Sequence, residues 1–539
     1  MTTFNLADLF EQAVDAWPDR DYIVAEGERR SFAEMEARAN RLAHHLAAAG
    51  IGPGDHVGIY AYNCVEWVET LWAVFKIRAV WININYRYVE EELRYLFDNA
   101  DLKALVFARE FAPRVRNVLD VMPLLRHTVV IEDGSGADLA GLDSVPYEDA
   151  VAEGSPERDF APRSGDDRYI LYTGGTTGMP KGVVWRHEDV FYALGGGVDL
   201  QDGTRVARPE EMIERGNRPG LARFFPVAPL MHGATQWSVM GGSFVGRTTL
   251  LMARFDANEV WRIVEAEGVQ SLFITGDAMG RPLTEALDAA PGRFDTSSLV
   301  VVVSTAAVFS PAVKDEFFRH LPNLIITESI GSSEGGGNGL TIIVKGQTAF
   351  TRGGPNVKAG LDSLVLDEDR KPASPGVVGR LARRGNVPLE YYKDPEKSAE
   401  TFLTLDGVRY VIPGDFARLE EDGTITLLGR GSQCINSGGE KIYPEEVETA
   451  LKSHPEVWDA VVIGVADERF GARVAAVVAP REGASPSLAS IQTHCREHVA
   501  GYKVPRSISW MDELPKTGSG KVLKRELRQP YWADRTANV

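Results

Sequence analysis

The sequence predicts an α/β fold with largely parallel strands, in a chain of more than one domain. First, apolar residues at helical spacing are followed by short apolar runs typical of buried strands, at 66–84, 255–275, 299–304 and 444–465. Second, 539 residues exceed one ordinary core and suggest about two to four domains. Third, the composition changes late, because glycine- and serine-rich GRGSQCINSGGEK precedes a compact segment of about 100 residues.

The elements follow from these patterns in order. In 255–275, Val260, Ile263 and Val264 predict a helix, and 271–274 predict a buried strand. Residues 133–166 are rich in Gly, Ser, Pro, Asp and Glu, which is typical of a surface connection, and they lead to a strand at 169–171. The polar stretch 202–218 is interpreted as a mobile flap. We place the boundary at 429–432, giving an N-terminal domain 1–430 and a C-terminal lid domain 431–539, with a hinge near Gly431–Ser432.

Composition excludes several classes of protein. Hydrophobic residues make up 44% and charged residues 25%, as in soluble globular proteins. The net charge of −18 disfavours nonspecific binding to nucleic acid or anionic membranes. The three cysteines, Cys64, Cys434 and Cys495, are far apart, the N-terminus lacks a signal-peptide pattern, and no apolar run approaches the roughly 20 residues of a membrane span. We expect a cytoplasmic protein.

The strongest motif is YTGGTTGMPKG at 172–182, directly after an apolar strand. Its glycines allow close backbone approach to phosphate oxygens, its threonines offer hydroxyl donors, and Lys181 adds positive charge. The spacing differs from GxxxxGK[ST], so the motif is not a Walker loop. It predicts a phosphate-binding loop, although a flexible glycine loop without a ligand is the plain alternative. The residues concerned are Thr173, Gly174, Gly175, Thr176, Thr177, Gly178, Lys181 and Gly182.

At these residues the sequence resembles the adenylate-forming superfamily of acyl-CoA synthetases, aryl-CoA ligases, luciferases and peptide-synthetase adenylation domains. The resemblance covers nearly the whole chain and includes SIGSSEGG at 329–336, YVIPGD at 410–415, GRGSQ at 429–433 and PKTGSGKVLKR at 515–525. It implies a large N-terminal domain of stacked α/β subdomains and a small mobile α+β C-terminal domain. The implied activity is ATP-dependent activation of a carboxylic acid to acyl-AMP with release of pyrophosphate, and then transfer of the acyl group to CoA.

The resemblance also assigns residues to ATP. Glu334 becomes the Mg²⁺ ligand, Asp415 the ribose acceptor, Arg430 a ribose or phosphate contact, and Lys521 the lysine that contacts the acid and the α-phosphate. Taken alone, Glu334 would be a surface acid and Arg430 a salt-bridge partner near a linker. The implied catalytic set is Lys521, Glu334, Arg430, Thr177 and Lys181, and further nucleotide contacts are Ala306, Ala307, Glu328, Ser329, Ile330 and Ser333.

The acyl pocket is assigned in the same way. APLMHG at 228–233 matches the family segment at the mouth of the acid pocket, so His232 is its candidate, with a hydrogen-bonded interior histidine as the alternative. No acid lies between Phe225 and Arg247, which disfavours an α-amino acid substrate. STAAVFSP at 304–311 departs from the usual Gly-Gly-Ala and looks most like actinobacterial ligases of sterol side chains and polycyclic terpenoid acids. The implied acyl contacts are His232, Gln236, Thr305, Ala306, Gly331 and Ser332.

The thiol half-reaction is assigned to SGGEK, where Ser437, Gly438 and Gly439 would line the CoA tunnel, and to a hinge at Ser432, where relatives carry Asp or Lys. The expected ligands are ATP, Mg²⁺ and CoA. Alternatives are a medium- or long-chain fatty acid CoA ligase, an enzyme that hands acyl-AMP to an acyl-accepting partner protein, luciferase-like oxygenation, and a sensor that binds ATP or an acid without turnover.

Overall fold

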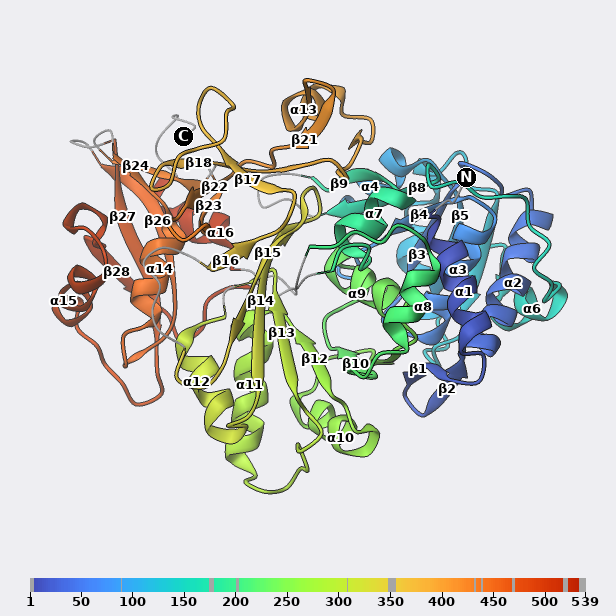
Figure 1. The fold of residues 1–539 in the computed structure, drawn as a ribbon, viewed down its shortest axis with the longest axis horizontal. Coiled ribbons are helices and arrows are strands. Elements are labelled where there is room, and N and C mark those ends of the chain that lie inside the picture. Colours follow the sequence, from blue (N-terminus) through green and yellow to red (C-terminus); the bar gives the residue numbers. More distant parts are fainter. Residues whose placement is uncertain are drawn as a thin grey trace. The chain divides into compact units, whose positions relative to one another are not determined.

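The computed structural model describes residues 4–88, 90–173, 179–199, 203–307, 309–347, 355–430, 433–437, 440–467, 471–516 and 522–532. They form two compact units (Figure 1). Unit 1 comprises Met1–Phe273, Ser332–Gly336 and Arg384–Val411, and unit 2 comprises Ile274–Gly331, Gly337–Arg383 and Ile412–Val539. The fold is mixed α/β, as predicted.

Unit 1 is built on an eight-stranded sheet of order β19-β9-β8-β4-β3-β5-β6-β7. The pairs from β8 to β7 are parallel, whereas β9 runs antiparallel to β8 and to β19. The strands are β3 (His56–Tyr60), β4 (Val80–Asn83), β5 (Leu102–Ala108), β6 (His127–Ile131), β7 (Ser144–Pro146), β8 (Arg168–Thr173), β9 (Lys181–Arg186) and β19 (Glu390–Tyr391). Strand β3 is buried along its whole length, as apolar strands of a covered parallel sheet are.

A second run of strands in unit 1 has the order β2-β1-β11-β10-β12. Its bounds are β1 (Asp21–Ala25), β2 (Glu28–Ser31), β10 (Arg223–Pro226), β11 (Thr248–Leu251) and β12 (Ser271–Ile274), and β20 (Phe402–Leu405) pairs β21 (Val408–Val411). The helices are α1 (Leu6–Ala16), α2 (Phe32–Ala48), α3 (Val65–Lys76), α4 (Glu90–Ala100), α5 (Ala112–Arg116), α6 (Tyr147–Glu153), α7 (His187–Leu194), α8 (Glu210–Gly216), α9 (Gly233–Ser243), α10 (Ala257–Glu267) and α13 (Pro395–Thr401). Aromatic side chains fill the core, where the Phe10 and Trp72 rings stack with centroids 4.2 Å apart.

A buried carboxylate helps to hold the segment 384–411 on unit 1, together with the pairing of β19 and β9. Asp189 on α7 is fully buried and accepts hydrogen bonds from Arg409 at 2.8 Å, Arg186 at 2.8 Å and Asn386 at 2.9 Å. Because a buried carboxylate is costly unless paired, these contacts fix where the segment attaches. The attachment brings β19 alongside β9 and places α13 near the end of the phosphate-loop hairpin.

Unit 2 contains the strand order β13-β14-β15-β16-β23-β22-β18, with β17 paired to β18. The bounds are β13 (Val301–Thr305), β14 (Ile325–Ser332), β15 (Gly336–Ile343), β16 (Asn356–Ala359), β17 (Ser363–Leu366), β18 (Val378–Arg384), β22 (Asp415–Leu419) and β23 (Thr424–Arg430), with helices α11 (Gly276–Ala289) and α12 (Pro311–His320). Strands β13 and β14 are parallel, but the pairs β15–β16, β16–β23, β22–β23, β18–β22 and β17–β18 are antiparallel. The prediction of largely parallel strands therefore fails in this part, because its strands pair in antiparallel register.

The C-terminal part of unit 2 is a sheet of order β25-β24-β27-β26, with β28 paired to β27 (orange to red in Figure 1). Its elements are β24 (Ile435–Ser437), β25 (Glu440–Ile442), α14 (Pro444–Lys452), β26 (Val457–Asp467), β27 (Gly471–Pro480), α15 (Leu488–His498), β28 (Ser507–Trp510) and α16 (Lys524–Trp532). The predicted boundary near Gly431–Ser432 lies outside the described residues and stays a prediction.

The element predictions are mostly confirmed. α3 with β4, α10 with β12, and α14 with β26 reproduce the expected helix–strand pairs, and β13 occupies the predicted apolar run. Two interpretations need correction. Residues 133–166 are no featureless connection, because they include β7 and α6, where Tyr147 is buried and donates to Glu69 at 3.0 Å. The described part of 202–218 includes α8, with Val206 and Met212 buried, so it packs onto unit 1 and is not a free flap.

Candidate active site

In unit 1 the phosphate loop joins two paired strands. Strands β8 and β9 form an antiparallel ladder that ends with Thr173 opposite Lys181, the two described residues on either side of the motif's first glycines. Gly182 must be glycine, because a Cβ would lie 2.9 Å from a methyl of Ile170 and 3.0 Å from the Tyr172 ring. The predicted Gly174, Gly175, Thr176, Thr177 and Gly178 lie outside the described residues.

Lys181 and Glu334 are brought together by one tyrosine that the sequence did not single out. The Nζ of Lys181 lies 5.3 Å from the centroid of the Tyr391 ring, and the Tyr391 hydroxyl donates to Glu334 Oε1 at 3.1 Å. Lys181 also forms an ion pair with Asp394, and this neighbouring ammonium lowers the pKa of Asp394. The cluster therefore combines a cation, a nearly buried carboxylate and an aromatic ring, all within unit 1.

The turn that carries Glu334 is fixed by its neighbours. The Trp185 indole N–H donates to the Ser333 carbonyl at 3.1 Å, and the Gly335 amide donates to the Ser332 hydroxyl at 2.8 Å. Trp185 is fully buried on β9, so the turn is anchored to the strand that begins with Lys181. A carboxylate placed in this way has little orientational freedom, which is what a metal ligand requires.

Two buried asparagines position the His232 segment. Asn83, at the end of β4, donates to the carbonyls of Tyr172 at 2.9 Å and Met231 at 2.7 Å. Its side-chain oxygen accepts from the Tyr172 amide at 2.7 Å. Asn63 accepts from the Leu230 amide at 2.7 Å. These contacts tie the residues before His232 to the strand that precedes the phosphate loop.

His232 and Gln236 lie at the start of α9. His232 is the partly buried residue that precedes the helix, whereas Gln236 is fully buried and accepts a hydrogen bond from the Tyr169 hydroxyl at 2.5 Å. Gly233 approaches β8 so closely that a Cβ would collide with Leu171. The acyl-contact role predicted for the two residues stays a prediction, and the structure adds that Gln236 is anchored to the core by its carbonyl oxygen.

In unit 2 the 305–307 turn has a strained backbone. Ala306 is exposed and adopts φ +66°, the left-handed region that disfavours a side chain. Ahead of it, the Thr305 hydroxyl donates to the Ser329 carbonyl at 3.0 Å, and the Ala307 amide donates to the Thr305 carbonyl at 2.9 Å. The usual family glycine would relieve this strain, so alanine here preserves a fixed turn at a cost of roughly 1 kcal/mol.

The neighbouring strand β14 carries Glu328, Ser329, Ile330 and Gly331. Burial raises the pKa of Glu328, although its ion pair with Lys314 on α12 acts in the opposite direction. In the parallel register, Ser304 lies opposite Glu328 and Thr305 lies opposite Ser329. The predicted nucleotide contacts on these two strands are therefore adjacent within unit 2.

Asp415 and Arg430 are also neighbours. They are register partners at the end of the antiparallel pair β22–β23, although they are 15 positions apart in the chain. Gly429 has φ +105°, and a Cβ there would collide with the Glu445 carboxylate. Burial raises the pKa of Glu445 to about 7, partly offset by Lys524, and Glu448 and Asp415 add to the rise. The predicted ribose contacts thus adjoin a carboxyl that the sequence had not indicated.

Two predicted loops are described only at their ends: the loop that carries Lys521, at residues 517–521, and the loop predicted to line the CoA tunnel, at residues 437–439. Lys521, Gly438, Gly439 and Ser432 lie outside the described residues. Ser437 and Glu440, which flank the two glycines in the sequence, are register partners of strands β24 and β25.

The loop of 517–521 is closed by a bridge between Lys516 and Val522. Lys516 is held by Asp459 at 2.7 Å, and Lys452 contacts the same carboxylate at 2.8 Å. Although burial acts to raise it, these two lysines lower the pKa of Asp459 to about 2.

The sequence reasoning missed Tyr391, Asp394, Asn83, Asn63 and Asp459. Only Asp394 had a local signal, because Asp followed by Pro is typical of a helix start, and its side chain does cap α13. The others act through contacts between distant parts of the chain, for which a single sequence holds no pattern.

Comparison with known proteins shows the family of the chain. Residues 10–392 match the family described as AMP-binding enzyme, and residues 446–521 match the AMP-binding enzyme C-terminal domain. A 3-oxocholest-4-en-26-oate–CoA ligase from Rhodococcus rhodochrous is 51% identical over 524 residues, covering 96% of this chain and 94% of the relative. A medium/long-chain-fatty-acid–CoA/3-oxocholest-4-en-26-oate–CoA ligase from Mycobacterium marinum is 50% identical, with the same coverage of both chains.

A solved structure shares the fold. The anthranilate CoA ligase AuaEII in complex with anthranoyl-AMP superposes with a TM-score of 0.83 at 23% identity, covering 99% of this chain and 98% of that one. The chain therefore belongs to the AMP-binding enzyme family of adenylate-forming ligases. Within it, the protein is an AMP-forming acyl-CoA synthetase, for which ATP and CoA are substrates, so the sensor alternative is set aside. Among the described residues, no helix is long and apolar enough to cross a membrane.

Proposed function

We propose that this acyl-CoA synthetase activates a bulky polycyclic carboxylic acid, of the steroid or diterpenoid kind. The observation that carries the proposal is 51% identity, over 96% of the chain, to a ligase named for a steroid acid. The exposed, left-handed Ala306 supports it, because a fixed turn at the predicted pocket wall suits a rigid substrate better than a flexible one.

We also propose the division of labour within the site. Lys181 and the amides of the phosphate loop would hold the triphosphate, Asp415 and Arg430 the ribose, and Lys521 the acid and the α-phosphate. Catalysis of this step consists of positioning and charge neutralisation, because a carboxylate must approach an anionic phosphorus. Lys181 and Glu334 both contact Tyr391, and this supports the assignment because the two charged groups would then face the same phosphates.

Glu334 fits a magnesium ion. Its carboxylate is nearly buried, accepts a hydrogen bond from Tyr391, and belongs to a rigid turn. A hard cation of this kind takes one or two carboxylates plus phosphate oxygens and water. When bound, Mg²⁺ would neutralise phosphate charge. The chain's own contribution is to hold the carboxylate and keep Lys181 close by.

In the second half-reaction, the CoA thiol would attack the acyl carbonyl, forming a thioester bond while the bond from the acyl carbon to AMP breaks. The hinge at Ser432 and the tunnel at Ser437, Gly438 and Gly439 are proposed for this step. The glycine pair supports the tunnel, because residues without side chains let a thiol arm approach the backbone closely, and Ser437 and Glu440 on either side of the pair are register partners.

The test is pyrophosphate release with ATP and Mg²⁺ across acetate, fatty acids of increasing length, and steroid and diterpenoid carboxylates, with and without CoA. We expect the highest kcat/KM for polycyclic acids and a CoA thioester confirmed by mass. Acyl-AMP that persists with CoA present would indicate an acceptor partner protein instead.

A second candidate substrate is a medium- or long-chain fatty acid, which the name of the Mycobacterium marinum relative favours. Replacing Ala306 by Leu separates the two, because a larger wall residue should reduce turnover of polycyclic acids more than that of flexible chains. The matched control is Ala289→Leu, an exposed alanine at the end of α11 to which no role in the site is assigned. Unchanged selectivity in Ala306→Leu would remove this residue from the pocket wall.

A further inference from the structure

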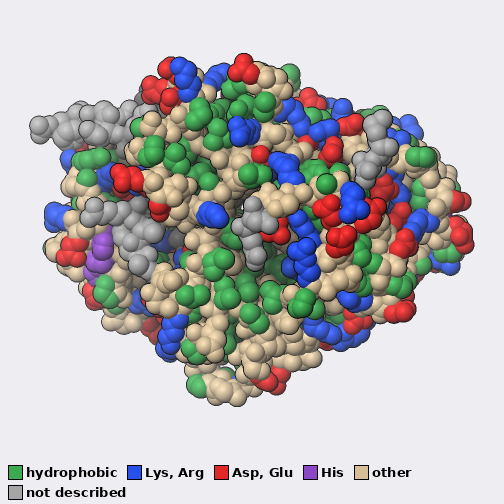
Figure 2. Space-filling view, in the orientation of Figure 1, with side chains coloured by type: hydrophobic (Ala, Val, Ile, Leu, Met, Phe, Trp, Pro, Cys, Tyr) green, Lys and Arg blue, Asp and Glu red, His purple; other side chains and the backbone are tan. Residues whose placement is uncertain are grey.

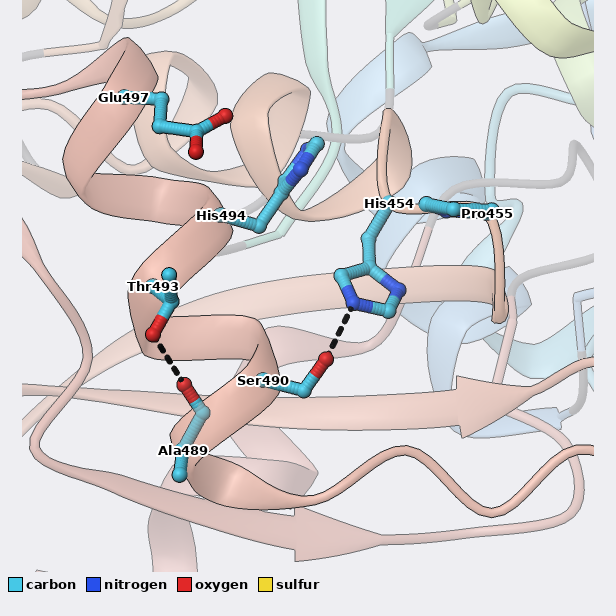
Figure 3. A pocket seen from close by; sticks show the side chains of 7 residues that line it. All are labelled: His454, Pro455, Ala489, Ser490, Thr493, His494 and Glu497. Atoms are coloured by element: carbon cyan, nitrogen blue, oxygen red, sulfur yellow. Dashed lines mark hydrogen bonds between the residues drawn. The ribbon is translucent and has the colours of Figure 1, made fainter.

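A hollow of about 430 Å³ lies on the C-terminal part of unit 2, and its lining includes none of the residues assigned to ATP, acid or CoA. Figure 2 shows His side chains at the surface over this part. The hollow is lined from two directions, by the turn after α14 and by one side of α15 (Figure 3). The lining residues are His454, Pro455, Ala489, Ser490, Thr493, His494 and Glu497.

Helix α15 presents three side chains able to bind a metal on one side. His494, Glu497 and His498 are spaced i, i+3 and i+4, which places them together on a helix. One ligand atom from each lies within 4.8 Å of the other two. Because zinc bonds to nitrogen and oxygen are about 2.0–2.2 Å, ligands of one ion can be up to about 4.4 Å apart, and a small side-chain adjustment suffices. In Figure 3 the His494 ring and the Glu497 carboxylate project from the same side of the helix.

The tautomer of His494 follows from its neighbours. The Ser453 hydroxyl donates its only proton to the Ala450 carbonyl, 2.8 Å away. The same hydroxyl oxygen lies 2.8 Å from His494 Nε2, so in that contact it must accept the hydrogen bond and Nε2 must carry the proton. The lone pair of His494 is then on Nδ1. Fixing a ring through its second nitrogen is the usual arrangement around a metal-binding histidine.

His454 encloses the site without serving as a ligand. It is buried, and its Nδ1 accepts from the Glu456 amide at 3.2 Å, so Nε2 donates to the Ser490 hydroxyl at 2.9 Å. Its ring packs edge-on against His494 with centroids 5.1 Å apart, and the His498 ring lies 4.6 Å from His494. His494 is thus held between two imidazoles.

We propose that His494, Glu497 and His498 form a binding site for a divalent transition metal, with His454 and Ser453 as positioning residues. Two imidazoles and one carboxylate suit Zn²⁺ and its neighbours, whereas Mg²⁺ and Ca²⁺ prefer oxygen ligands alone. The fourth position would hold water. The site differs from the magnesium site of the ATP reaction in both ligands and location in the chain.

The experiment is a calorimetric titration of the chelator-treated, full-length protein with Zn²⁺ in excess Mg²⁺. We expect one equivalent to bind, and we expect His494→Gln/His498→Gln to abolish that step while pyrophosphate release without Zn²⁺ is unchanged. Glu497→Gln should weaken binding by at least about tenfold. Ser453→Ala should weaken it by about ten- to a hundredfold at unchanged stoichiometry, as loss of an outer-shell partner does.

The matched control is His45→Gln/His127→Gln, because these two imidazoles also face one another, with Nε2 atoms 2.9 Å apart in unit 1. This control should keep the Zn²⁺ step, and Zn²⁺ should raise the Tm of the control and of the wild type but not of His494→Gln/His498→Gln. Two outcomes would overturn the proposal. One is that the His494→Gln/His498→Gln variant binds Zn²⁺ as the wild type does; the other is that a folded His45→Gln/His127→Gln variant no longer binds it.

Discussion

The two loops that carry the predicted catalytic lysines are anchored by different forces. The phosphate loop joins β8 and β9, whose ladder pairs six residues on each strand, and β8 lies inside the sheet between β4 and β9. The loop before Val522 is closed by one bridge, at Lys516, and by ion pairs to Asp459 and Glu448. Backbone ladders fix register independently of pH and salt, whereas ion pairs respond to both. The first loop should therefore be the more robust of the two.

The largest effect should come from the second loop. Replacing Lys521 by Ala should reduce acyl-AMP formation by about 10²–10³-fold, because one charged donor to the transition state is lost. Thioester formation from supplied acyl-AMP should remain. Pyrophosphate release and single-turnover thioester assays check the two halves separately, and loss of neither half-reaction would remove Lys521 from the site.

Stability of the first loop depends on Asn83. Replacing it by Ala leaves the Tyr172 amide and two carbonyls without their partner, which should cost about 2–4 kcal/mol in the free energy of unfolding. Asn85→Ala, where the side chain caps one exposed turn, is the control and should cost under about 1 kcal/mol. Denaturant unfolding measures both. Equal losses would show that the asparagine contacts add nothing specific.

Glu445 makes the region around the second loop sensitive to pH. Its pKa is raised to about 7 in the folded state, so its protonated form favours folding. That contribution is fully present below about pH 4.5 and is lost as pH rises to about 7, at up to about 1.4 kcal/mol per unit of pKa difference.

The measurement for Glu445 is the difference in unfolding free energy between Glu445→Gln and the wild type across pH 4–8. The variant should gain relative stability between about pH 4.5 and 7, with no further change above that range. A difference that does not vary with pH would mean that this carboxyl has its ordinary pKa in the folded protein.

A substitution at Lys516 tests the ion pair between Lys516 and Asp459 that closes the second loop. Lys516→Ala removes the loop's contact with Asp459 and should slow adenylation by about tenfold at low salt, equivalent to about 1.4 kcal/mol, and by less at high salt, because salt already screens the ion pair in the wild type. The control is Lys397→Ala, an exposed lysine paired with Glu400 on α13, which should have no effect. A normal adenylation rate in Lys516→Ala would show that the single bridge is enough.

The smallest effect is expected at Ala306. Ala306→Gly should raise the Tm slightly, by the equivalent of about 1 kcal/mol or less, because glycine adopts φ +66° without strain. The greater conformational entropy of glycine in the unfolded chain offsets only part of this gain. A lower Tm would indicate that the turn is not strained.

Elements with strong local patterns were predictable. The pairs α10–β12 and α14–β26 followed from apolar spacing, and the apolar run before the glycine motif indicated strand β8. Local signals sufficed because each lies within about 25 residues. The antiparallel sheet after Gly336 and the packing of α8 were missed, because strand direction and burial depend on partners distant in the chain.

By itself the sequence determined the α/β class, the helix–strand pairs and the residue types that suit phosphate, ribose and thiol chemistry. Tertiary structure alone decided which charges and hydrogen bonds meet. Lys181 pairs with Asp394 across 213 positions, and Asn83 reaches Met231 across 148. The physical reason is that propensity and periodicity act over a few residues, whereas a buried polar group finds its partner wherever folding brings the two together.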